Sequence, residues 1–488
     1  MRTLGYYLST ALIIGIVFAA AQTDESRIHG PARVAAGYAV SVGLLLAIAA
    51  LVRAPTGPVR AAGRRVSLPT LLVVATVLLL CDLFASKFSA YLNVQWRSPP
   101  IMPLIVVVTG WIVLVARIRR RGATLSRLAL AMTWLVVGSR VLVLLVSPFD
   151  RLRGDMLEAI DRSLDLLLAG RFPYVNSPPL MPYLPGMFLA YLPPKLLGLD
   201  LRLSNLVLDG ASAWLAVRLA SGAGDPRRVV REVPVGGILL PLLMLHPTWV
   251  YKAVNTQFSP TLFTTLFLAR AMSGAGPRLQ GASLGLAVGC NQMLGAISPI
   301  ALIHWLARFG VRRAVAATLV AVGVFLAMIA PFLVWDARGF LTIAFAQRIH
   351  FGPELMAGRF TLLPAAEALI PNASAILTLF ALVLGALAAW RAPGGQETTG
   401  VMAVTLCAVL LVQPVSFTHY YLPALVLAAE ATPIDEADPS PSAPPDHGSD
   451  HSCQRRPGNG RTGTEPHVSA AGACAARASN PRGGLLSW

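Results

Sequence analysis

The stretch that decides the fold runs from Phe149 to Asp209: FDRLRGDMLEAIDRSLDLLLAGRFPYVNSPPLMPYLPGMFLAYLPPKLLGLDLRLSNLVLD. It places acidic, basic, tyrosine and proline residues among apolar segments that are long enough to cross a bilayer. Charged side chains this close to hydrocarbon are costly, and their concentration usually marks a place where something is bound or reacted. We therefore expect a functional site in this stretch.

The composition of the whole chain indicates a membrane protein. Of 488 residues, 55% are hydrophobic and 13% are charged, whereas soluble domains carry about 25% charged residues. Apolar segments able to cross about 30 Å of hydrocarbon recur along most of the length. These proportions exclude an ordinary soluble domain. They predict an all-α, multi-pass protein of the plasma membrane with roughly 13–14 transmembrane segments.

The net charge of +17 comes from arginines in short clusters between the apolar segments. The clusters are Arg53, Arg60, Arg64 and Arg65; Arg117, Arg119, Arg120, Arg121 and Arg127; Arg218, Arg227, Arg228 and Arg231; and Arg308, Arg312 and Arg313. This is the pattern of cytoplasmic loops under the positive-inside rule. It argues against a nucleic-acid partner and favours contact with membrane lipids, including anionic headgroups.

Placing the basic loops inside gives a path with a cytoplasmic N-terminus. Tyr6–Ala21 is interpreted as a first span, not a signal peptide, because no small-residue cleavage site followed by a soluble domain is evident. Spans are expected near 6–21, 34–52, 68–86, 101–116, 128–147, 203–220, 234–250, 258–272, 314–335, 373–390, 399–415 and 419–431. Segment 281–307 is too short to cross twice, so a broken hairpin with its apex at Cys290–Gln292 is expected.

Three parts of the chain follow from this path. Residues 1–127 form N-terminal extra spans, 128–432 form the core, and 433–488 form a disordered cytoplasmic tail rich in Pro, Gly and Ser. Within the core, 149–202 is expected to be a long external loop, because the prolines of 180–198 disfavour a regular crossing helix. A second external loop is expected at 336–371.

The first external loop begins with an amphipathic helix over 155–170. Its apolar residues recur at helical spacing, opposite a polar side, and Gly170 supplies a stop. The apolar residues are Leu157, Ile160, Leu164 and Leu167, and the polar residues are Asp155, Glu158, Arg162 and Asp165. Such a helix is suited to the membrane interface. Asp155 is either a helix N-cap or a carboxylate that deprotonates a hydroxyl or holds a divalent cation, and both roles are compatible.

The motifs after this helix resemble the GT-C glycosyltransferases, most closely bacterial family 87 and its actinobacterial relatives of mannosyltransferase type. The matching residues are Asp155, Leu167-Leu168-Ala169-Gly170-Arg171-Phe172-Pro173-Tyr174, Pro178-Pro179-Leu180, Asp200-Leu201-Arg202, Asp209 and Pro331-Phe332-Leu333-Val334-Trp335-Asp336-Ala337-Arg338-Gly339-Phe340. The resemblance covers about 128–432 and implies a GT-C-like helical bundle whose long first external loop carries juxtamembrane helices.

The resemblance also implies an activity. It is transfer of a hexose or pentose, plausibly mannose or a pentose analogue, from a polyprenyl-phosphate donor to a cell-envelope glycan or glycolipid on the outer face. Asp155 would be the catalytic base or would hold Mg²⁺ or Mn²⁺; no other cofactor is implied. The residues expected around the substrate and its phosphate are Glu158, Arg171, Tyr174, Lys195, Arg202, Lys252, Gln257, Asn291, Gln292, Arg348, His350, His419 and Tyr420.

The chain departs from the family pattern at two places. The hairpin apex reads Asn291-Gln292 where relatives usually carry a Lys, and the outward span ends in Asn255-Thr256-Gln257 where an acidic residue is common. Two other functions therefore stay open: a lipid-linked-sugar transporter or flippase, and a catalytically inactive scaffold in envelope biosynthesis. For the individual cations, the alternative to phosphate binding is an interfacial side chain that extends toward water.

Overall fold

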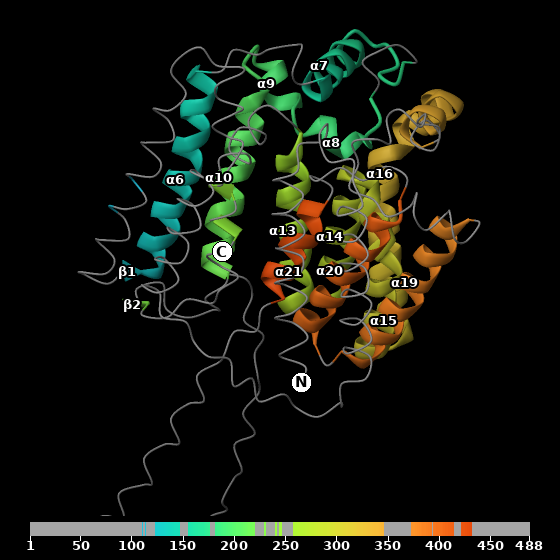
Figure 1. Ribbon diagram of the computed structural model, residues 1–488. Coiled ribbons are helices and arrows are strands. Elements are labelled where there is room, and N and C mark those ends of the chain that lie inside the picture. The colour runs from blue at the N-terminus through green and yellow to red at the C-terminus, as the bar shows by residue number, and fades with distance from the viewer. Residues whose placement is uncertain are drawn as a thin grey trace, which may run out of the picture. The chain divides into compact units, whose positions relative to one another are not determined.

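The computed structural model (Figure 1) describes residues 110, 113, 123–146, 155–175, 181–219, 229–230, 240–241, 244–245, 257–345, 372–392, 394–413 and 421–431. The spans expected before residue 101, most of the span at 234–250, most of the second external loop and the tail at 433–488 lie outside these residues.

The described part is a bundle of helices. Its long helices are α6 (Leu125–Val146), α10 (Arg202–Leu219), α13 (Phe258–Gly274), α14 (Pro277–Cys290), α15 (Ser298–Phe309), α16 (Val311–Ala344), α19 (Ala373–Arg391), α20 (Gly395–Leu411) and α21 (Leu422–Glu430). Strands β1 (Ala123–Thr124) and β2 (Val229–Val230) form a two-residue antiparallel pairing, with Ala123 opposite Val230. Within this part, α6, α16 and α19 are long and apolar enough to cross a membrane, as expected for a helical membrane protein.

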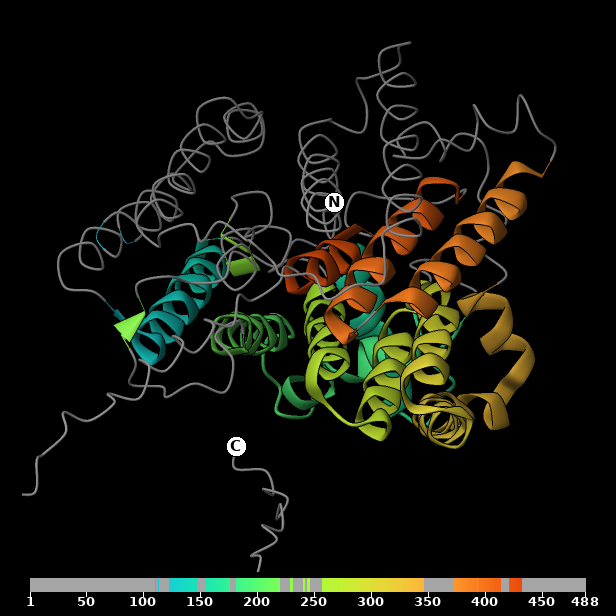
Figure 2. The ribbon, with the colours of Figure 1, turned by 90° about the horizontal axis from the view of Figure 1, so that it is seen from below.

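The helices are held by one large apolar core. Along the bundle (Figure 2), α6, α10, α13, α14 and α16 follow one another, each packed on the next, and α20 and α21 pack on α13. Where α14 meets α16, the backbones approach closely because Gly281 and Gly285 present no side chain to the carbonyls of Ala317 and Ala321. Small residues at four-residue spacing permit such close helix packing in membranes.

A second apolar core lies under the short helices that follow α6. These are α7 (Asp155–Leu168), α8 (Pro185–Leu189) and α9 (Leu192–Leu196). Leu157, Ile160 and Leu164 of α7 are buried, as the helical spacing predicts. They pack among side chains of α8 and of the end of α16, so protein covers the apolar side that we expected to face the membrane interface.

Segment 180–198 forms no crossing helix in its described residues, 181–198. Helices α8 and α9 have five residues each, so each is about 7.5 Å long at 1.5 Å per residue. Pro185 and Pro193 occupy the first turns of these helices, where the missing N–H costs nothing. Residues 181–198 thus interrupt the series of long helices, as their prolines predict.

Helix α16 kinks at Asp336, directly after the predicted span at 314–335. Residues 337–344, which belong to the expected loop at 336–371, are helical. Asp336 alone has non-helical angles (φ −154°, ψ 89°), and its Oδ1 accepts a hydrogen bond from the Gly339 N–H at 2.9 Å. Asp336 thus caps a new helical turn after the kink, which the sequence interpretation missed.

Candidate functional site

The segment at the end of α7 is fixed by a helix stop and a buried tyrosine. Gly170 has φ +68°, and the N–H groups of Gly170 and Arg171 bond the carbonyls of Leu167 (3.0 Å) and Leu166 (2.8 Å). These are the two bonds of a Schellman motif, which needs a left-handed residue where glycine stands. The chain then turns back and carries Tyr174 into the second core.

Tyr174 is an anchor in this core. It is 3% exposed, and its ring lies against Phe340, Phe332 and Phe188 with centroid distances of 4.9, 5.8 and 6.0 Å. Its hydroxyl donates to the Tyr183 carbonyl at 2.9 Å. Burial raises the pKa of Tyr174 well above its ordinary value, so the phenol stays protonated. Tyr174 was predicted to contact the substrate; in the structure it is buried and positions the loop.

The hairpin breaks where the sequence predicts. Helix α14 ends at Cys290, and Asn291 is extended (φ −144°, ψ 108°). The Asn291 side chain accepts a hydrogen bond from the Met293 N–H at 3.1 Å and so caps the 3₁₀ helix η1 (Gln292–Ile297). This buried amide satisfies backbone that the break would leave without a partner.

Gln292 joins the hairpin break to two other segments. Its Nε2 donates to the Pro182 carbonyl at 2.8 Å and to the Ala344 carbonyl at 3.2 Å. Beside it, α8 packs directly on the end of α14, since a Cβ on Gly186 would lie 2.7 Å from the Gly289 carbonyl oxygen. Gln292 therefore holds the first loop against the hairpin break.

Gln257 holds the same loop from another helix. It precedes α13, is 2% exposed, and donates from Nε2 to the Tyr183 hydroxyl at 2.5 Å. The segment at residues 181–184 thus receives side-chain hydrogen bonds from three residues, Tyr174, Gln257 and Gln292. Within the described residues, the Oε1 atoms of both glutamines are buried without a hydrogen-bond partner.

A second set of polar groups lies next to this segment. The Tyr191 hydroxyl donates to Asn205 Oδ1 at 2.7 Å. The pKa of Tyr191 is raised well above its ordinary value, first by burial and then by the negative charge of Asp209. Tyr183 and Cys290 act on it in the same direction, so the two tyrosines, the hairpin break and Asp209 share one neighbourhood.

Asp209 pairs with an arginine that the sequence interpretation did not single out. Arg140 Nε lies 2.7 Å from Asp209 Oδ2, and both side chains are 1% exposed. Arg140 Nη1 also donates to the Met244 carbonyl at 2.6 Å and to Ser139 Oγ at 3.0 Å. The available signal was one arginine inside the otherwise apolar segment 128–147, which by default marks a functional or partnered position.

Two cations expected at the phosphate are bound to carboxylates. Lys195 Nζ lies 2.6 Å from Asp161 Oδ1 and 2.7 Å from Asp165 Oδ1, which links α9 to α7. Partial burial alone would lower the pKa of Lys195, but the hydrogen bonds and charges of the two aspartates outweigh it and raise the pKa. The ammonium therefore stays charged and is neutralised by the two aspartates.

Arg202 is engaged in the same way. It is 5% exposed and binds Asp200 through Nε at 3.0 Å and Nη2 at 2.6 Å. Partial burial alone would raise the pKa of Asp200, but the hydrogen bonds and charge of Arg202 hold it below its ordinary value. The Asp-x-Arg motif thus forms a local ion pair at the start of α10.

The remaining predicted residues are less closely defined. Glu158 is half-buried and Arg171 is exposed. Asp155 begins α7, but its side chain lies outside the described residues. Also outside are Lys252, Arg348, His350, His419 and Tyr420. Among the residues that the structure describes, no three His, Cys, Asp or Glu side chains come together as a metal site.

No family model, curated protein or solved structure matches this chain.

The geometry therefore has to stand by itself. Of the predicted residues, Tyr174, Gln257 and Gln292 converge on one loop segment, and Asn291 caps the break beneath it. Lys195 and Arg202 are bound to carboxylates at the edge of the same loop. The arrangement attaches a short, proline-rich loop to the hairpin break and to the start of α13.

Proposed function

We propose that this chain is a membrane glycosyltransferase with a GT-C-like fold. It transfers a sugar from a polyprenyl-phosphate donor to a cell-envelope glycan or glycolipid at the outer face. The observation that carries the proposal is the attachment of residues 181–184 to the hairpin break through Gln292, beside a second attachment to the start of α13 through Gln257. This attachment brings the loop motifs and the break, which the resemblance treats as parts of one site, into contact.

The reaction is a single displacement at the anomeric carbon. The acceptor oxygen forms a bond to that carbon, the bond from the carbon to the phosphate oxygen breaks, and polyprenyl phosphate leaves. Asp155, at the N-terminal end of α7, takes the proton from the acceptor hydroxyl. If a divalent cation takes part, Asp155 would help to hold it, and the cation would lower the pKa of that hydroxyl. Gln292, whose amide N–H groups are bonded to the carbonyls of Pro182 and Ala344, supports the loop and does not replace the charge of a Lys.

Asp155→Asn tests the proposal because Asn caps a helix as well as Asp does. Purified full-length protein is given polyprenyl-phosphomannose, or the pentose analogue, with a synthetic alkyl mannoside as acceptor, with and without a chelator. We expect Asp155→Asn to lower turnover by about 10²–10⁴-fold while the thermal unfolding midpoint stays unchanged.

The matched control is Glu397→Gln, which removes a carboxylate charge from the first turn of α20, outside the site described above. This variant should transfer sugar at the wild-type rate. An Asp155→Asn protein within about threefold of wild type would leave Asp155 as a cap only. Wild-type protein that transfers neither mannose nor the pentose would contradict the enzyme proposal and favour a lipid-linked-sugar transporter or an inactive scaffold.

A further inference from the structure

The kink of α16 comes where a membrane crossing by this helix would end. Helix α16 is long and apolar enough to cross a membrane. Arg312 and Arg313 stand at its start, and residues 314–335 carry no charge. This stretch rises about 33 Å at 1.5 Å per residue, close to the roughly 30 Å of hydrocarbon in a bilayer. The kink at Asp336 therefore lies at the boundary opposite the two arginines, which is the outer one on the expected topology.

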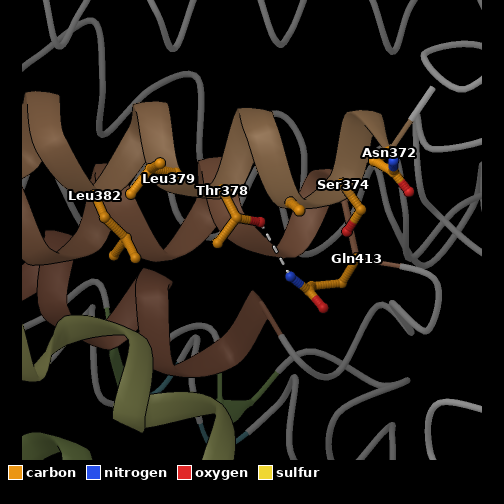
Figure 3. A pocket seen from close by; sticks show the side chains of 7 residues that line it. Asn372, Ser374, Thr378, Leu379, Leu382 and Gln413 are labelled. Carbon is orange, nitrogen blue, oxygen red and sulfur yellow. Dashed lines mark hydrogen bonds between the residues drawn. The ribbon is translucent and has the colours of Figure 1, made fainter. Parts of the chain in front are cut away.

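Helix α19 shows the same boundary in its own side chains. It begins at the end of the bundle where α16 stops (Figure 1). Figure 3 shows Asn372, Ser374 and Thr378 at its start, before the apolar part of the helix. Thr378 Oγ1 accepts a hydrogen bond at 3.2 Å from Gln413, which follows the end of α20. Both helices thus change from apolar to polar at this end of the bundle.

After the kink, the short end of α16 has two different sides. Phe340, Ile343 and Ala344 are buried in the second apolar core. On the other side, Arg338 is exposed and Leu341 is 50% exposed. One side therefore attaches the segment to the protein, while the other presents a cation and an apolar side chain together at the membrane boundary.

A second arginine joins this surface from the first loop. The ring of Phe172 packs edge-on against Trp335, with centroids 5.9 Å apart. A Cβ on Gly339 would lie 3.0 Å from the same ring. Arg171, the residue before Phe172, is exposed. An exposed guanidinium therefore stands within one residue of this contact, beside a Trp, which is a residue enriched at membrane interfaces.

The charge of this surface is positive. Arg171 and Arg338 contribute two guanidiniums, and Asp336 contributes one carboxylate. Asp336 Oδ1 already accepts a hydrogen bond from the Gly339 N–H at 2.9 Å, at a helix start that favours negative charge. Guanidiniums suit a lipid phosphate because their N–H groups bind two phosphate oxygens at once.

We propose that the end of α16 binds an anionic phospholipid of the bilayer surface. The lipid phosphate lies on Arg338, with Arg171 next to it. An acyl chain runs over Leu341 and over Val334, which is 87% exposed, toward the hydrocarbon. Trp335 lies at the level of the headgroups. The bound lipid holds α16 and the first loop at one depth in the membrane, independently of the proposed sugar transfer.

Photo-crosslinking of the detergent-solubilised full chain tests this with phosphatidylglycerol that carries a diazirine on one acyl chain. Peptide mapping should find the crosslink within residues 334–345. Unlabelled phosphatidylglycerol should prevent it about five- to ten-fold better than phosphatidylcholine of the same chain length. Arg338→Gln should weaken this competition about five-fold, whereas Arg338→Lys keeps the charge and should stay within about two-fold of wild type.

The matched control is Arg278→Gln, the same change at an exposed arginine in the first turn of α14, which should crosslink like wild type. A wild-type protein without a crosslink in 334–345 would overturn the proposal, as would equal competition by phosphatidylcholine or an Arg338→Gln protein that behaves like wild type. Polyprenyl phosphate that competes where phosphatidylglycerol does not would also overturn it. Neither sugar donor nor acceptor is present, so a failed transfer assay is a separate result.

Discussion

Substitution of Gly285 by alanine tests the close packing of α14 on α16. A Cβ at this position would overlap the carbonyl oxygen of Ala321 and lie 3.0 Å from Val324 Cβ. Carbon atoms pack best at about 3.5–4.0 Å, so α14 and α16 would have to separate by about 0.5–1 Å. A gap of that size forfeits about a quarter to a half of each contact along the shared seam.

The expected cost is about 1–3 kcal/mol, the usual range for overpacking. Since the obstacle is backbone rather than a flexible side chain, we expect the upper half of that range. Alanine also favours helix over glycine by up to about 1 kcal/mol, which offsets part of it. The net loss should be about 1–2 kcal/mol, seen as a fall of several degrees in the unfolding midpoint of detergent-solubilised protein.

Gly323 is the matched control, an exposed α16 glycine with no heavy atom within 4 Å of an added Cβ. Gly323→Ala should be neutral or slightly stabilising, because only the helix preference acts on it. The two variants therefore differ in packing alone. A Gly285→Ala protein at least as heat-resistant as Gly323→Ala would refute the close approach of the two helices.

Two further predictions concern charge. Arg140→Met should destabilise the protein by about 3–5 kcal/mol, because Asp209 is left buried and unpaired. The double variant Arg140→Met/Asp209→Leu should recover most of that loss in the same thermal assay. A double variant as unstable as the single one would contradict the pairing. Because Arg202 holds the Asp200 pKa below its unfolded value, their stabilisation is present above about pH 4 and is lost as the pH falls through the folded pKa. Asp200→Asn should reduce the fall in stability at low pH by under about 1 kcal/mol, since the carboxyl is partly exposed. Unfolding midpoints that change with pH equally in wild type and variant, measured from pH 3 to 6, would argue against it.

Local patterns in the sequence predicted local structure well. Helix α7, its buried side and its stop at Gly170 follow from the spacing of Leu157, Ile160 and Leu164, because those contacts depend on neighbours within two turns. The hairpin break at Asn291 follows from length, since two arms of that size cannot both cross the bilayer. These features needed no knowledge of distant segments.

Distant partners could not be predicted from single positions. Lys195 stands 34 positions from Asp161, and Arg140 stands 69 positions from Asp209. Nothing near Lys195 indicates that a carboxylate will neutralise it, so Lys195 was expected to be available for phosphate. The apolar segment around Arg140 indicates that this arginine has a partner, but not which one. The extension of α16 past Asp336 was missed for a different reason, because an aspartate that ends one helix can cap the next.

The two hydrogen bonds from one glutamine amide have a mechanical consequence. Gln292 donates to the carbonyls of Pro182 and Ala344 from the same nitrogen. The proline-rich loop and the final turn of α16 therefore share one hydrogen-bond donor. Neither can lift from the bundle without straining the other. A molecule that displaced this amide would release both the loop at Pro182 and the last turn of α16 in one step.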